Sequence, residues 1–96
     1  MSPLYLIAEI YPKQDELETL AEEFKTLLEK TRAENGCIFY DLVQEEQSKD
    51  WLMVEKWESR THWEAHDSSD HVKRIQSLGH LFEKDTHLRF MTEVEL

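Results

Sequence analysis

Apolar and polar residues alternate along several stretches of the chain, and this period of two predicts β-strands. The predicted strands span residues 4–11, 37–44, 51–58 and 88–96. Pro12 should end the first strand, because proline cannot donate a hydrogen bond to a neighbouring strand. The polar segment 45–50 is expected to form a hairpin loop between the second and third strands.

In residues 15–33 the apolar positions have a different spacing: they recur every three or four residues, with charged residues between them. This spacing is typical of a helix that packs one face against a core. Asn35 and Gly36 follow it and tolerate the left-handed conformation that closes a helix. One amphipathic helix is therefore expected between the first and second strands.

Two shorter helices are predicted before the last strand, over residues 59–66 and 70–82, the second capped by Ser68 or Ser69. The resulting order is β-α-β-β-α(α)-β, which predicts an α+β, ferredoxin-like fold with an antiparallel sheet. We expect residues 1–96 to form a single domain, since a chain of 96 residues has room for one core.

The predicted strands are apolar on both faces. In the third strand, Trp51, Met53 and Trp57 alternate with Leu52 and Val54. The helices of this fold cover one face of the sheet, and a bare apolar face is unusual for a monomer. We therefore expect a homodimer, a dimeric α+β barrel in which two sheets pair and leave part of the enclosed space open as a ligand pocket.

Composition narrows the range of partners. Acidic residues outnumber basic ones by 21 to 11, for a net charge of −10, and Lys73-Arg74 is the one adjacent basic pair. Nucleic acids and anionic membranes bind concentrated positive charge, so neither is expected as a partner. Because no secretory signal or apolar run of about 20 residues is present, we expect a cytoplasmic protein. Cys37, the single cysteine, is interpreted as a packing residue.

Three segments in register carry a family resemblance. They contain Gly36-Cys37-x-x-Tyr40, then Glu55-x-Trp57, then Ala65-His66 followed by Ser69-x-His71. This pattern resembles the antibiotic-biosynthesis monooxygenase family of dimeric α+β barrels, in particular its small quinol-monooxygenase-like members. The resemblance implies an oxidoreductase that uses neither metal nor flavin, because an electron-rich quinol or phenol reduces oxygen directly.

The function implied by this resemblance is a cofactor-independent monooxygenase whose partners are a small quinol or polyphenolic aromatic and O₂. The same scaffold suits an isomerase of a small phosphorylated carbonyl compound, or a non-catalytic dimer that binds a small ligand. Haem degradation, another activity of the superfamily, is disfavoured. Residues 4–11 contain no Asn, His66 stands where that branch has Trp, and Gln76 stands where it has the haem-binding His.

His66 and His71 are the catalytic candidates, on the family match. His66 is the first choice for a base, because imidazole exchanges protons near neutral pH; the alternative is an inert, hydrogen-bonded histidine near a helix end. His71 falls in the first turn of the following helix, where the helix dipole should keep its ring neutral. A structural role at the start of that helix is the alternative.

Tyr40, Glu55 and Trp57 are the substrate-binding candidates. Aromatic residues in strands belong to the core more often than they contact a ligand, so packing is the favoured interpretation of Tyr40 and Trp57. Glu55 shares a strand face with Met53 and Trp57, where a carboxylate needs a partner or has a raised pKa. A substrate hydroxyl would provide that partner, as would Arg89 or the second chain.

A metal site is the last candidate. His62 and His66 lie four residues apart on one helix face, and a third ligand would come from His71, Asp67 or Asp70. Trp63 stands where the His-Glu-x-x-His motif has its glutamate. A chain with two glycines also lacks a glycine-rich phosphate loop. We therefore expect no metal and no other cofactor.

Overall fold

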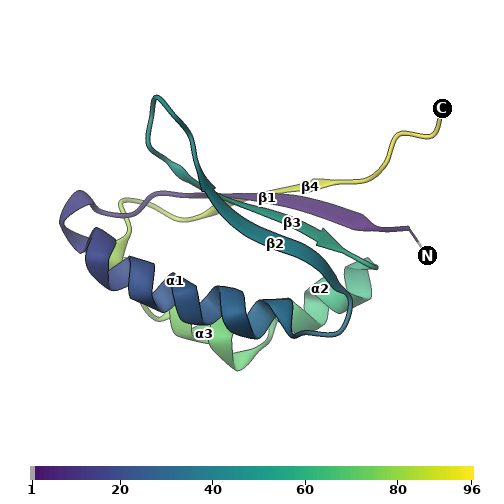
Figure 1. Cartoon of the computed structure of the whole chain (residues 1–96), viewed down its shortest axis with the longest axis horizontal. Coiled ribbons are helices and arrows are strands. Elements are labelled where there is room, and N and C mark those ends of the chain that lie inside the picture. Colours follow the sequence, from purple (N-terminus) through teal and green to yellow (C-terminus); the bar gives the residue numbers. More distant parts are fainter. Residues whose placement is uncertain (1) are drawn as a thin grey trace.

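The order of strands and helices is the one that the sequence predicts (Figure 1). The computed structural model describes residues 2–96, and none of the helices in that range is long and apolar enough to cross a membrane. The described elements are β1 (Leu4–Ile10), η1 (Gln14–Glu16), α1 (Leu17–Arg32), β2 (Cys37–Gln44), β3 (Trp51–Trp57), α2 (Arg60–Asp67), α3 (Asp70–Gln76), η2 (Gly79–Leu81) and β4 (His87–Met91).

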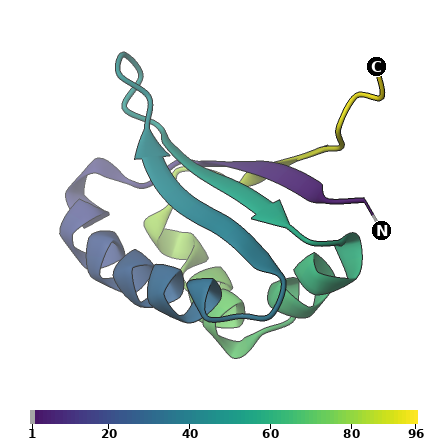
Figure 2. The same ribbon diagram turned by 45° about the vertical axis from the view of Figure 1, so that its right-hand side comes forward.

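The four strands form one antiparallel sheet in the order β2-β3-β1-β4. Helices α1, α2 and α3 all lie on the same face of this sheet, as the two ribbon views show (Figures 1 and 2). The predicted α+β, ferredoxin-like fold is confirmed.

The core lies between the sheet and the helices. Every second residue of β1 is buried, beginning with Leu4, and the buried stripe of α1 faces it with Leu20, Phe24 and Leu27. Full burial of a side chain of this size contributes about 1.5–3 kcal/mol to folding. The period of two in the strands and of about 3.6 in α1 thus meet in one apolar layer.

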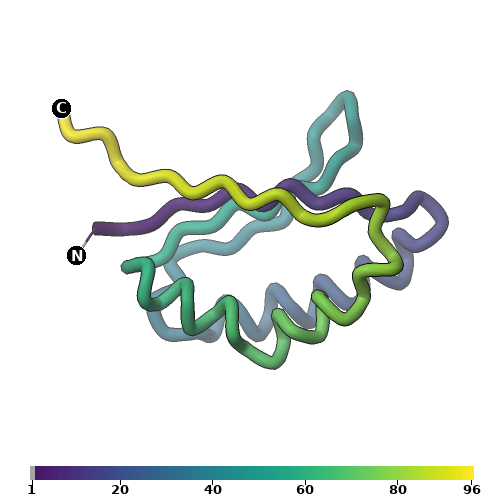
Figure 3. Tube along the Cα trace, turned by 180° about the vertical axis from the view of Figure 1, so that it is seen from behind, coloured from purple at the N-terminus to yellow at the C-terminus, as the bar shows by residue number. Residues whose placement is uncertain are grey.

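The C-terminal elements are shorter than predicted. β4 ends at Met91, because its partner β1 pairs Tyr5 with Met91 and begins only one residue earlier. Beyond Met91 the chain pairs with none of the described strands and extends away from the sheet (Figure 3). Helix α3 ends at Gln76 and gives way to η2, since Gly79 is a poor helix residue.

No described helix covers the second face of the sheet, which we call the outer face. Its apolar side chains come from all four strands: the partly buried Tyr5, Ile7, Phe39, Leu52, Val54 and Met91, and the exposed Val43. The two-faced apolar pattern of the sequence is therefore present in the folded chain.

Candidate functional site

A cavity of about 260 Å³ opens between the inner face of the sheet and the helices. Most of its lining is apolar, and the polar lining residues are Tyr40, Glu55, His66, Asp67, Gln76 and Thr86. Neither lysine nor arginine is among the described residues that line it. The cavity therefore suits an apolar or aromatic ligand that carries few polar groups.

Helix α2 places His66 in the wall of this cavity. Ser59 caps the helix by accepting a hydrogen bond from the His62 backbone N–H. His66 lies in the last turn of the helix, lines the cavity and is only 4% exposed. The ring packs against Trp57 and Tyr40, with centroid distances of 4.7 and 5.2 Å. Burial lowers the pKa of His66, and its hydrogen bond to Glu34 opposes that shift.

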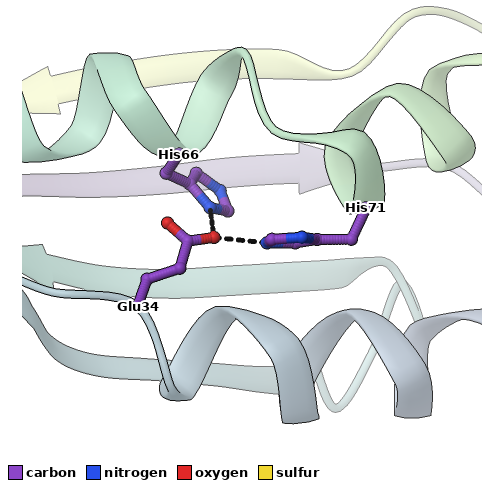
Figure 4. Close-up of side chains that lie close together, drawn as sticks. All are labelled: Glu34, His66 and His71. Carbon is purple, nitrogen blue, oxygen red and sulfur yellow. Dashed lines mark hydrogen bonds and ion pairs between the residues drawn. The ribbon is translucent and has the colours of Figure 1, made fainter.

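Glu34 joins two histidines that come from different helices (Figure 4). It lies in the turn between α1 and β2, and its Oε1 is 3.0 Å from Nδ1 of His66. The same oxygen is hydrogen-bonded to Nε2 of His71, which is in the first turn of α3. We call these three residues the Glu-His-His cluster.

The hydrogen bonds of Glu34 determine which ring nitrogens carry protons. An ionised carboxylate only accepts hydrogen bonds, so Nδ1 of His66 and Nε2 of His71 must both donate. In a neutral imidazole the second nitrogen is then an acceptor. His66 therefore holds Nε2 as a free proton acceptor in a ring that lines the cavity.

Glu55 is the second ionisable group in the cavity wall. It lies in the middle of β3, 3% exposed, and accepts a hydrogen bond of 3.0 Å from Nε1 of Trp57. Burial raises its pKa to about 7, and the charges of Asp67 and Glu34 act in the same direction. Arg89, one of the partners considered for Glu55, instead pairs with Glu9 at 3.5 Å. Both residues lie on the outer face, because the positions of Glu9 in β1 and Arg89 in β4 alternate with positions whose side chains face the core.

The remaining predicted residues divide between the cavity and its surroundings. Tyr40 lines the cavity, and burial raises the pKa of its phenol, which therefore stays protonated. Trp57 is fully buried behind the lining and contacts both Glu55 and His66. His71 lies beyond Glu34 and lines a separate helix-side cleft with Glu34, His62 and other residues.

The residues considered as metal ligands, although no metal was expected, are only partly brought together. Glu34, His66 and His71 each offer a ligand atom, and these atoms all lie within 4.8 Å of one another. His62 does not join them, because its Nδ1 lies 2.7 Å from the Ser59 hydroxyl instead. Among the residues that the structure describes, neither Asp67 nor Asp70 is part of such a group.

Cys37 is half-buried and packs against the core. Burial raises the pKa of its thiol to about 11, so the reactive thiolate is scarce at neutral pH. Its interpretation as a packing residue agrees with this environment.

Comparison with known proteins identifies relatives of the chain. The profile of the family described as "Antibiotic biosynthesis monooxygenase" matches residues 3–78. The protein named "Putative monooxygenase Rv0793" of Mycobacterium tuberculosis is 31% identical over 70 residues, which cover 73% of this chain and 69% of that protein.

Solved structures share the whole architecture. The structure of Rv0793 superposes with a TM-score of 0.90 at 25% identity and covers 99% of this chain and 98% of its own. A conserved protein from Methanosarcina mazei Go1 gives a TM-score of 0.88 at 29% identity, with 95% and 92% covered. A crystal structure described as an antibiotic biosynthesis monooxygenase gives 0.89 at 26% identity, with 96% and 99% covered.

Proposed function

Because the chain belongs to the antibiotic biosynthesis monooxygenase family, we propose that it is a cofactor-independent monooxygenase acting on a small quinol or polyphenolic aromatic. The observation that carries this proposal is the position of His66. Its ring lines an apolar cavity and is held by Glu34 with Nε2 free to accept a proton.

The chemistry follows from that geometry. A substrate hydroxyl that donates to Nε2 of His66 loses its proton to the ring, and the carboxylate of Glu34 stabilises the imidazolium that forms. The phenolate gives up an electron to O₂ far more readily than the phenol. In the complete reaction one oxygen atom enters the substrate, the substrate loses two hydrogen atoms, and the second oxygen atom leaves as water.

Glu55 and Tyr40 complete the polar part of the proposed site. The protonated phenol of Tyr40 is a hydrogen-bond donor, whereas Glu55 accepts from a second hydroxyl of the substrate when it is ionised. The apolar walls keep water from the phenolate and its radical, which limits side reactions.

The alternative isomerase receives less support from the same cavity. A phosphorylated carbonyl substrate needs cations, and the described lining carries Glu55 and Asp67 but neither lysine nor arginine. A non-catalytic dimer would bind a small ligand in the cavity and would have no need of a proton acceptor there. Oxygen consumption distinguishes this alternative from the monooxygenase.

The direct test is oxygen uptake with a panel of quinols and polyphenols. His66→Ala should lower the rate by about a hundredfold or more, which is typical for loss of a general base. The matched control is His80→Ala in η2, an exposed residue outside the cavity, and it should keep the parent rate. A folded His66→Ala protein that oxidises the same quinol at the parent rate would contradict the assignment.

We also propose that the working form is a homodimer in which two outer faces pack together. The support is the row of partly buried apolar side chains on the outer face and the exposed Val94 and Leu96 beyond the sheet. A cytoplasmic location and a single domain over residues 1–96 stay predictions from the sequence.

A further inference from the structure

We propose that the Glu-His-His cluster binds one divalent transition-metal ion of the Zn²⁺ class, and that the bound ion prevents His66 from accepting a proton. The site itself is independent of the proposed oxygenase function. The loss of proton acceptance matters for turnover only if that function is correct.

The first support is the convergence of ligand atoms. One ligand atom from each of the three residues lies within 4.8 Å of the other two, although the residues come from the α1–β2 turn, α2 and α3. Oε1 of Glu34 contacts both Nδ1 of His66 and Nε2 of His71. Ligand atoms that bind one ion of this class lie about 2.0–2.2 Å from it, so they must also converge within a few ångströms of one another. The fold thus brings three ligand atoms from separate segments to a spacing that suits a single ion.

The second support is the type and burial of the ligands. Two imidazoles and one carboxylate suit Zn²⁺, Co²⁺, Ni²⁺ or Cu²⁺ better than Mg²⁺ or Ca²⁺, which prefer oxygen ligands throughout. The side chains of Glu34, His66 and His71 are 18, 5 and 16% exposed, so bulk water competes weakly for the ion.

The third support is an entry path that avoids the substrate cavity. Glu34 and His71 line the helix-side cleft, so an ion reaches them from that side while His66 borders the cavity on the other. Water in the cleft would complete the coordination. The net charge of −10 also favours the approach of cations.

The consequence for His66 follows from its two ring nitrogens. Without metal, Nδ1 donates to Glu34 and Nε2 is the acceptor. An ion on Nδ1 takes the lone pair of that nitrogen, so the neutral ring must carry its proton on Nε2. The ring would then present a donor to the cavity in place of the acceptor that proton removal needs.

The test uses the untagged, full-length protein after treatment with a chelator. Co²⁺ titration should produce the visible bands of a four- or five-coordinate ion at one ion per chain, and Zn²⁺ should displace it. His71→Ala and Glu34→Gln should each weaken binding by about a hundredfold or more, because even losing a group that only orients a ligand costs about 10–100-fold. His80→Ala and His62→Ala are the controls and should bind like the parent.

Thermal unfolding without metal shows first that each variant folds. Added Zn²⁺ should then raise the Tm of the parent and of both controls, and leave Glu34→Gln and His71→Ala unchanged. If the parent binds no ion, or if both cluster variants bind it as tightly as the parent does, the proposal is overturned.

Activity separates this inference from the proposed function. Metal binding by a protein that oxidises no quinol leaves the site intact and contradicts the oxygenase. Quinol oxidation that continues unchanged with one Zn²⁺ bound at the cluster overturns the effect on His66.

Discussion

The neighbours of His66 bury its ring and also determine which ring nitrogen carries the proton. Trp57 and Tyr40 exclude water from the ring, while Glu34 holds its Nδ1 hydrogen. An imidazole without Glu34 could carry its proton on either nitrogen, and only one of these forms accepts a proton from the cavity. Glu34 therefore has a positioning role in the proposed mechanism.

Glu55 makes the stability of the protein depend on pH. Burial raises its pKa from 4.5 to about 7, so the folded chain binds this proton more tightly than the unfolded chain does. Protonated Glu55 therefore contributes about 3 kcal/mol to the free energy of unfolding below pH 4.5. This contribution is lost as the pH rises from 4.5 through 7. Glu55→Gln removes the loss and keeps an oxygen that accepts from Trp57.

Glu55→Gln should therefore be more stable than the parent at pH 8, and its advantage should be smaller by about 2 kcal/mol at pH 5.5. Urea unfolding at both pH values and one protein concentration measures this difference. The charges that act on Glu55 in the same direction, Asp67 and Glu34, are unchanged in the variant. An advantage that does not change with pH would show that Glu55 titrates normally in the folded chain.

The residues of the site differ in how far the sequence could predict them. His66, Glu55 and Tyr40 were predicted and line the cavity, because each stands at an inward position of a regular element. Glu34 had no predicted role, since it lies in a turn and its partners are 32 and 37 residues further along the chain. No periodicity or local motif joins positions that only the folded chain brings together.

Helices and strands likewise differ in how far the sequence could predict them. Local periodicity was sufficient for β1, β2, β3 and α1, whose patterns are long and regular. The end of β4 was overestimated because it depends on where β1 begins, which is a property of the strand pair. The apolar positions after α3 continue past Gln76, so the pattern alone could not show where that helix stops.

The turn between α1 and β2 depends on Gly36. Its φ of +85° is unfavourable for residues with a side chain, and an added Cβ would lie 2.3 Å from the His62 ring in α2. Gly36→Ala should therefore lower the free energy of unfolding by about 2–4 kcal/mol, from the backbone conformation and the displaced helix together. Because the same turn carries Glu34, the quinol oxidation rate should fall as well.

Gly79→Ala is the matched control for that prediction. No atom lies within 4 Å of an added Cβ at Gly79, and its φ is not in the left-handed range. Alanine there should change stability by less than about 1 kcal/mol, or raise it slightly by restricting the unfolded chain. Chemical denaturation of both variants measures the contrast, and equal effects would refute the role given to the Gly36 turn.

At the scale of the whole molecule, the sheet has one covered face and one open face (Figures 1 and 2). The covered face holds the core and the cavity, whereas the outer face shows partly buried apolar side chains from all four strands. A second copy of the chain would bury these side chains without disturbing the cavity. Folding and dimerisation therefore place demands on opposite sides of the same strands.

Met53 and Val54 separate these two demands, since they are neighbours in β3 and face opposite sides of the sheet. Met53 is 1% exposed in the core, and Val54 lies on the outer face between Ile7 of β1 and Asp41 of β2. Met53→Lys should unfold the chain, because an unpaired charge in the core costs several kcal/mol. Val54→Lys should leave the fold intact and oppose the packing of two outer faces.

Sedimentation at low micromolar concentration, with circular dichroism for the fold, should show a dimeric parent and a folded, monomeric Val54→Lys protein. A parent that sediments as a monomer would refute the dimer. A Val54→Lys protein that stays dimeric would place the interface elsewhere than on the outer face.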